Sequence, residues 1–228
     1  MNDIQLHYIE QGQGHPLILL HGNGESCDYF VHQIACFCHD YRVIALDTRG
    51  HGLSPRGEKP FTIKQFAEDL HDFMDEKGIE KAILLGFSDG GNIALEFALK
   101  YPERVEKLIL NGANLFPSGV KPLYQWPIEI GYRIAKLFSK KSEKALRNTE
   151  LLGLMVNEPH IKPLELARLT MPVLVIAGTK DMIKDSHTRL IYNSLPNAQL
   201  AIIEGDHFLA NKNPEAFNKV VERFLSCN

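Results

Sequence analysis

The sequence predicts an α/β fold built around a mostly parallel sheet with helices on both faces. Short apolar runs recur along the chain, and they are too brief for ordinary helices and typical of strands buried on both faces. Amphipathic segments long enough to be crossover helices separate these runs, and such crossovers join parallel strands. A chain of 228 residues, 44% of them hydrophobic, can also bury a sizeable core.

Each expected element has its own local signal. Residues 4–9 alternate apolar and polar side chains, whereas the later strands are continuous apolar runs. Thr62 and Gln65 have the spacing of a capping box that opens a helix, and Gly78 ends that helix. The expected strands are residues 4–9, 16–20, 42–46, 82–87, 105–111, 172–178 and 199–203. The expected helices cover residues 28–38, 62–77, 92–100, 185–194 and 214–225.

The alternation lapses between residues 116 and 169, which contain no apolar strand run. Prolines are followed there by two amphipathic segments near residues 128–140 and 142–156. Because this stretch interrupts the chain at the edge of the sheet where loops gather, we expect it to form a helical cap. The predicted organisation is a core of residues 1–115 and 170–228 with a cap of residues 116–169.

A glycine-rich turn joins the apolar run at residues 82–87 to the helix that follows. Its sequence, Gly86-Phe87-Ser88-Asp89-Gly90-Gly91, is a G-x-S-x-G pattern between a predicted strand and a predicted helix. That setting favours a tight turn that holds the central serine in a strained, exposed conformation. Ser88 is therefore the candidate nucleophile, at a helix N-terminus whose free N–H groups can stabilise an oxyanion.

A serine nucleophile needs a general base, and a histidine base needs a third group that fixes its tautomer. His207 follows the last expected strand and is the predicted base. His21 and His51 lie beside glycines in tight loops, where we expect structural hydrogen bonds. Asp181 ends the preceding strand and is the predicted acid, with Asp185 as its rival and as a candidate helix N-cap.

Two backbone N–H groups are the predicted oxyanion donors. One belongs to Asp89, directly after the serine, and the other to Asn23 in the loop at residues 21–24. The Asp89 side chain has two alternative roles. In one role, its negative charge in the first turn interacts favourably with the helix dipole. In the other, it attracts a cationic group of the substrate, such as the amino group of an aminoacyl ester.

Charge and cysteine content bear on partners and metals. The formal net charge is −3 with no long basic run, so neither nucleic acid nor an anionic membrane is indicated, and the expected partner is a small molecule. The polar N-terminus and the lack of a long apolar stretch predict a cytoplasmic protein. No metal is predicted, because the cysteines lack paired zinc-site spacing and are expected to be buried thiols: Cys27, Cys36, Cys38 and Cys227.

Taken together and in order, five segments resemble the α/β-hydrolase family over nearly the whole chain: residues 21–24, 47–54, 86–91, 178–181 and 205–207. The resemblance implies an α/β-hydrolase fold with an eight-stranded, mostly parallel sheet and a helical cap before the acid. It also implies a triad of Ser88, Asp181 and His207 and a mainly structural loop at residues 47–54. The Ser-Asp-Gly-Gly elbow is similar to that of small esterases of the biphenyl-hydrolase-like (valacyclovir hydrolase) type, although this cap is short.

The predicted activity is hydrolysis of a small carboxylic ester through an acyl-enzyme, without a cofactor. The cap is expected to roof the site, with Trp126 and Phe138 against the acyl group. A serine nucleophile argues against dehalogenases, which place Asp there, but it does not separate esterases from carbon–carbon hydrolases. A non-enzymatic small-molecule receptor on the same fold is the alternative from another class.

Overall fold

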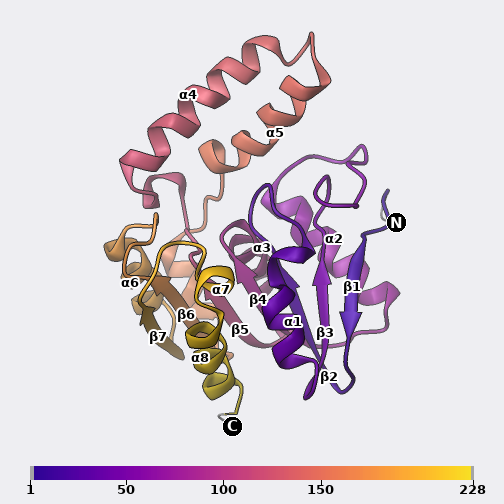
Figure 1. Ribbon diagram of the computed structural model, residues 1–228, viewed down its shortest axis with the longest axis vertical. Helices are drawn as coiled ribbons and strands as arrows, with labels where there is room; N and C mark the ends of the chain where they lie inside the picture. The colour runs from indigo at the N-terminus through magenta and orange to yellow at the C-terminus, as the bar shows by residue number, and fades with distance from the viewer. Residues whose placement is uncertain (1–2, 227–228) are drawn as a thin grey trace.

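The computed structural model, which describes residues 3–226, has a central sheet with helices on both sides (Figure 1). The sheet order is β1-β3-β2-β4-β5-β6-β7, and every pair is parallel except β1 with β3. The described residues therefore form seven strands, one fewer than the family resemblance implies. The strands are β1 (Tyr8–Gln11), β2 (His15–Leu20), β3 (Tyr41–Leu46), β4 (Ala82–Phe87), β5 (Val105–Asn111), β6 (Val173–Gly178) and β7 (Ala198–Ile203).

The helices follow the expected alternation, with one addition. The short α7 has no signal of its own in the sequence. The helices are α1 (Val31–Phe37), α2 (Ile63–Glu76), α3 (Asp89–Lys100), α4 (Pro122–Phe138), α5 (Glu143–Asn157), α6 (Asp185–Ser194), α7 (Leu209–Lys212) and α8 (Pro214–Ser226). Thr62 caps α2 as expected by accepting from the N–H of Gln65, but the Gln65 side chain bonds Asp69 instead of closing a capping box.

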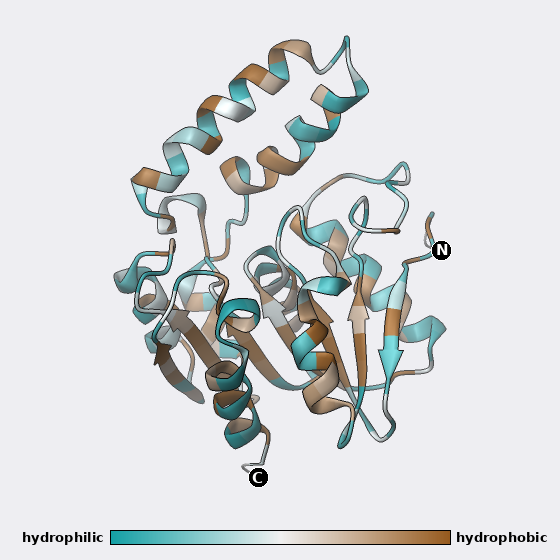
Figure 2. Cartoon of the chain, in the orientation of Figure 1, coloured by the Kyte–Doolittle hydropathy of each residue, from teal (hydrophilic) through white to brown (hydrophobic). Residues whose placement is uncertain are grey.

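Side chains of the central strands alternate between two apolar cores. In β2, Ile18 and Leu20 belong to the core under α2 and α3, whereas Leu17 and Leu19 belong to the core under α1 and α8. The strands are accordingly hydrophobic along most of their length (Figure 2). Because these strands are buried on both faces, their sequences are continuous apolar runs.

The first strand begins later than its sequence predicts. It starts at Tyr8, because the preceding chain turns toward the buried Arg49, whose guanidinium lies 2.6 Å from an Asp3 carboxylate oxygen and 2.7 Å from one of Asp69. A buried cation requires such partners, and this requirement outweighs strand pairing for the first residues.

Helices α4 and α5 form an antiparallel pair, here called the helical hairpin, that rises above the ends of the strands (Figure 1). Helix α4 begins at Pro122 and continues through Pro127, although the sequence predicts a start after that proline. Proline is tolerated at the first helical position, and Pro127 removes only one intrahelical hydrogen bond. No helix within residues 3–226 is long and apolar enough to cross a membrane.

Replacing Gly90 by alanine should prevent normal folding. A Cβ there would overlap the backbone carbonyls of Leu20 and His21, which belong to β2 and the loop after it and have no room to move. We expect a loss of about 3 kcal/mol or more in the free energy of unfolding. Gly78→Ala is the control, because Gly78 has φ +62° in open space and should cost only about 1 kcal/mol. Equal urea-unfolding midpoints for the two variants would contradict the prediction.

Candidate active site

Ser88 occupies a sharp turn between β4 and α3. With φ 52° and ψ −119°, it is the only residue other than glycine with a positive φ within residues 3–226. Its N–H donates to the carbonyl of Asn111 at 2.8 Å. Its own carbonyl accepts from the N–H groups of Gly91 and Asn92, which explains why α3 begins at Asp89 and takes in the glycines of the turn. Such backbone strain persists only where neighbouring contacts hold it.

His207 joins Ser88 to Asp181 in one hydrogen-bonded chain. Its Nε2 lies 3.0 Å from Ser88 Oγ, and its Nδ1 lies 2.7 Å from Asp181 Oδ1. Because an ionised carboxylate can only accept, Nδ1 carries the proton and Nε2 accepts from the serine hydroxyl. The structure thus brings together the three residues predicted as nucleophile, base and acid, from the loops after β4, β7 and β6 respectively.

The Asp181 carboxylate is buried and well supplied with donors. Burial opposes its ionisation, but the bonds from His207 and from the backbone N–H groups of Ile183 (2.9 Å) and Gly178 (3.3 Å) outweigh burial and hold the pKa of Asp181 below its ordinary value. Asp185, the rival acid, is exposed and pairs with Arg189 at 2.9 Å. Asp181 is therefore an anion at neutral pH, as a partner of an imidazolium must be.

The imidazole of His207 is held between other groups. Its ring centroid lies 4.9 Å from that of Phe87 and 5.7 Å from that of Phe208. Gly112 has φ +64°, and a Cβ at this position would come within 2.6 Å of the His207 ring. Gly112 therefore leaves the space that the imidazole occupies.

Three other buried histidines have structural partners. His21 Nε2 accepts from the N–H of Thr48 at 3.0 Å, and His51 Nδ1 lies 3.0 Å from the Thr48 hydroxyl, in agreement with the structural roles expected for both. The sequence gives no sign of the role of His187, whose Nε2 accepts from the N–H of Leu115 at 2.9 Å. Burial lowers the pKa of His51 and that of His187 to about 4 each, so both stay neutral at physiological pH.

The loop and the helix that carry the two predicted oxyanion donors both adjoin Ser88. Asp89 is the first residue of α3, where a backbone N–H has no intrahelical acceptor. A Cβ on Gly22 would lie 3.2 Å from Ser88 Cβ, so the loop that carries Asn23 passes directly beside the serine. The side-chain amide of Asn23 donates to the carbonyl of Leu151 in α5 at 2.7 Å.

The carboxylate of Asp89 is buried beside the serine and incompletely paired. Its Oδ1 accepts from Asn92 Nδ2 at 3.1 Å, whereas its Oδ2 has no hydrogen-bond partner among the described residues. Burial raises the pKa of Asp89 to about 6, although the nearby side-chain amides of Asn23 and Asn92 counteract part of this effect. Asp89 is therefore a buried carboxylate with a raised pKa beside Ser88.

Asp89→Asn should change how stability depends on pH. The ordinary pKa of 3.8 is raised to about 6 in the folded state, so Asp89 stabilises the fold below about pH 4 and loses that contribution as pH rises through 6. At pH 7 the neutral amide should make unfolding more costly than in the wild type, by up to roughly 3 kcal/mol. The measurement is urea unfolding of both proteins from pH 4 to 7, with Asp185→Asn as an exposed control. A difference that is the same at every pH would refute this account.

The helical hairpin is attached to the site through side chains that the sequence does not single out. At its root, Lys121 donates its N–H to the Met182 carbonyl at 2.8 Å and its ammonium to the Asp181 carbonyl at 2.5 Å. Farther out, Arg56 Nε lies 2.9 Å from a Glu150 carboxylate oxygen of α5. These contacts and the Asn23 bond couple the hairpin to both the acid loop and the oxyanion loop.

Trp126 and Phe138, the predicted acyl contacts, lie on α4 and are 66% and 54% exposed. Neither takes part in a ring contact with the described residues around Ser88. Their role in substrate binding therefore stays a prediction, with no contact in support of it.

The loop at residues 47–54 is organised by Asp47. Its carboxylate accepts from the N–H groups of Cys27 (2.7 Å) and Leu53 (2.8 Å) and lies 2.8 Å from His7 Nδ1. His7, Cys27 and Asp47 place potential ligand atoms within 4.8 Å of one another, but the Asp47 oxygens are already occupied by these donors. The arrangement agrees with the structural role expected for this loop.

The expectation of buried thiols is right for Cys27 and wrong for Cys36 and Cys38, which are half-buried. Helix α1 buries Gln33, Ile34 and Phe37, so the two cysteines fall toward its outer side. Cys227 lies outside the described residues.

Comparison with known proteins gives the family. A family model described as the alpha/beta hydrolase fold matches residues 15–140. Human Serine hydrolase BPHL is 30% identical, in an alignment that covers 99% of this chain and 84% of that protein. The 3-oxoadipate enol-lactonase 2 of Acinetobacter baylyi is 27% identical, with coverage of 98% and 94%. The solved structure of a meta-cleavage product hydrolase from Pseudomonas fluorescens matches with a TM-score of 0.79 and 26% identity, over 97% of this chain and 94% of that one. The chain therefore belongs to the α/β-hydrolase family, and its predicted likeness to the biphenyl-hydrolase-like type is confirmed.

Proposed function

We propose that this hydrolase cleaves small carboxylic esters with Ser88 as nucleophile, His207 as general base and Asp181 as the orienting acid. The observation that carries the proposal is the continuous chain from Ser88 Oγ to His207 Nε2 (3.0 Å) and from His207 Nδ1 to Asp181 (2.7 Å). A serine hydroxyl is a weak nucleophile until a base accepts its proton, and this chain supplies the base in the correct tautomer.

The reaction proceeds in two halves. Ser88 Oγ attacks the acyl carbon while its proton passes to His207 Nε2, and the negative charge that forms on the carbonyl oxygen is stabilised by the N–H groups of Asp89 and Asn23. Asp181 stabilises the imidazolium. His207 then returns the proton to the leaving alkoxide, and the alcohol departs from an acyl-Ser88 intermediate. A water molecule, deprotonated by His207, attacks the acyl carbon of this intermediate. The bond from the acyl carbon to Ser88 Oγ then breaks, His207 returns the proton to Ser88 Oγ, and the carboxylic acid is released.

The test is pre-steady-state hydrolysis of a panel of nitrophenyl esters. A burst of nitrophenol close to the enzyme concentration would support an acyl-enzyme, and absence of turnover of every activated ester would favour the non-enzymatic receptor. The similarity to a meta-cleavage product hydrolase makes carbon–carbon hydrolysis the second candidate. Turnover of a dioxo substrate without ester hydrolysis would replace the proposed function by that one.

For the Asp89 side chain we propose binding of a cationic group on the acyl part of the substrate. Its unpaired, buried Oδ2 supports this choice over a role with the helix dipole alone. An ammonium group would supply the missing donor and would favour the ionised form of the carboxylate. This proposal presupposes ester hydrolysis at Ser88.

Alanyl and propionyl esters, which differ chiefly in the amino group, provide the measurement. We expect the ratio of their kcat/KM values to favour the alanyl ester by about tenfold or more in the wild type, as one charge-assisted hydrogen bond allows. The ratio should approach one in Asp89→Asn and should fall in the wild type as pH drops below about 6, where Asp89 is protonated. An unchanged ratio in the variant would refute amine binding without touching the assignment of Ser88.

A further inference from the structure

Helix α4 carries an apolar stripe that nothing among the described residues covers. Its large side chains recur at helical spacing on one face of the helix. The stripe consists of Leu123, Trp126, Ile130, Ile134, Leu137 and Phe138, which are between 54% and 77% exposed. Most of the large hydrophobic side chains that are exposed in the described residues lie on this one helix, and such concentrations mark interaction sites.

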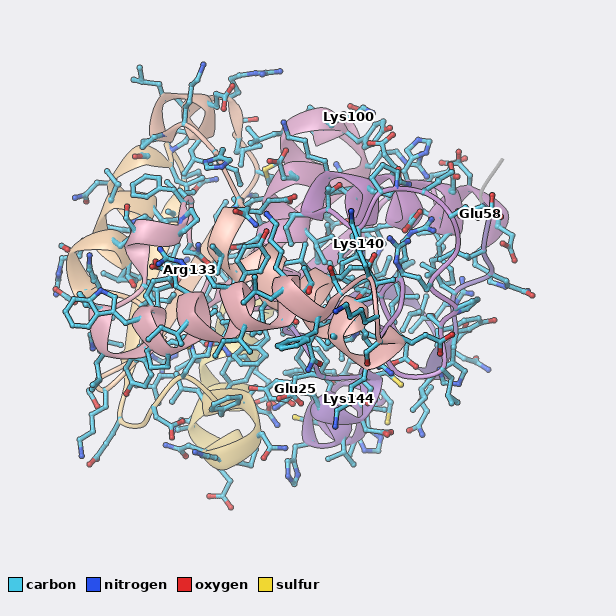
Figure 3. The ribbon with its side chains drawn as sticks, turned by 90° about the horizontal axis from the view of Figure 1, so that it is seen from above. Glu25, Glu58, Lys100, Arg133, Lys140 and Lys144 are labelled. Atoms are coloured by element: carbon cyan, nitrogen blue, oxygen red, sulfur yellow. The ribbon has the colours of Figure 1, made fainter. Side chains whose placement is uncertain are left out.

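The stripe borders the face of α4 that packs on α5. In that packing, Gly131 lies against Leu152 and Tyr132 lies against Gly153. Ile134 and Phe138 lie at the border between the two faces. In the view from above, α4 crosses the top of the molecule nearest the viewer (Figure 3). A groove of about 520 Å³ between the two helices is lined in part by Ile134 and Phe138 and continues the stripe.

The surroundings of the stripe are basic. Residues 122–157 hold six lysine and arginine residues and three glutamates, although the whole chain has a formal charge of −3. Arg133, Lys140 and Lys144 are all exposed and lie around α4 in the view from above (Figure 3). The net charge of the whole chain conceals this local excess of lysine and arginine. The composition therefore gives no indication that the protein binds an anionic surface.

We propose that the helical hairpin docks on an anionic lipid surface, with the α4 stripe in the interface and the surrounding lysines and arginines at the headgroups. A helix with Trp, Phe and Leu on one face and Lys and Arg beside it is suited to lie in the plane of such a surface. Charge complementarity favours this occupant over a second copy of the chain, because two copies would oppose basic rims. The proposal also gives Trp126 and Phe138 a lipid contact in place of the predicted acyl contact.

Trp126 supplies the probe, because it is the only tryptophan of the chain. Its fluorescence should shift to the blue when the full chain is mixed with vesicles of equal parts phosphatidylcholine and phosphatidylglycerol, and the protein should sediment with them. Vesicles of phosphatidylcholine alone should bind at least about tenfold more weakly, and about 0.5 M salt should reverse most of the shift.

Two pairs of variants separate apolar and basic contributions. Ile130→Gln with Leu137→Gln should abolish the shift, whereas the control pair Leu53→Gln with Leu164→Gln, whose leucines are 76% and 89% exposed, should not. Lys140→Glu with Lys144→Glu should weaken vesicle binding at least about tenfold, whereas Lys81→Glu with Lys219→Glu, which changes the net charge equally, should have a smaller effect. Circular dichroism identifies any variant that fails to fold.

Three results would overturn the proposal. The first is no shift and no sedimentation with anionic vesicles. The second is equal binding to both kinds of vesicle with no dependence on salt. The third is a concentration-dependent dimer in sedimentation equilibrium that the Ile130→Gln, Leu137→Gln pair dissociates, because a second copy would then occupy the stripe.

Discussion

Ser88→Ala is expected to lower kcat for a nitrophenyl acetate ester by about 10⁶-fold while the protein stays folded. Loss of the nucleophile removes the covalent route, and the remaining members of a triad give little benefit without it. The side chain is small, and the turn is held by backbone bonds to Asn111, Gly91 and Asn92 that alanine keeps.

The matched control is Ser186→Ala, at an exposed position in α6, which should leave turnover unchanged. Circular dichroism and the thermal midpoint check folding in both variants. Activity of Ser88→Ala within tenfold of the wild type would show that another group performs the attack.

Asp181→Asn should cost about 10⁴-fold in kcat, the second-largest effect. An amide cannot satisfy all the donors that now point at the carboxylate. If the NH₂ group takes the place of Oδ1, it opposes the N–H of Ile183 and forces His207 into the wrong tautomer. If it takes the place of Oδ2, it opposes the N–H of Gly178. In both orientations the imidazolium loses its counter-charge.

Asp185→Asn is the control for this variant, because it changes an exposed carboxylate at the start of α6 that pairs with Arg189 at the surface. Its kcat should stay within about twofold of the wild type, since exposed ion pairs contribute little. Were Asp185→Asn the damaging change and Asp181→Asn mild, the acid would be misassigned.

The sequence predicts the core of the molecule well, for a physical reason. Strands β4 and β5 and helix α6 have the bounds expected from the sequence, because burial on both faces of a strand and on one face of a helix leaves a local apolar pattern. The chain order of strand-end residues likewise places Ser88, Asp181 and His207 at one edge of the sheet.

Other features depend on contacts between distant parts of the chain and leave no local pattern. Asn23 bonds the carbonyl of Leu151, Arg56 pairs with Glu150, and His187 accepts from Leu115, each across many residues. Which face of α4 is covered also depends on a later helix, so apolar spacing alone could not show that its stripe stays exposed.

Active-site labelling tests the assignment of Ser88 most directly. The wild type and Ser88→Ala are incubated with an organophosphonate, and the modified peptide is identified by mass spectrometry. We expect one adduct, on the peptide that contains Ser88, and none in the variant. An adduct on another residue of the wild type, or equal labelling of Ser88→Ala, would contradict the proposed nucleophile and with it the mechanism.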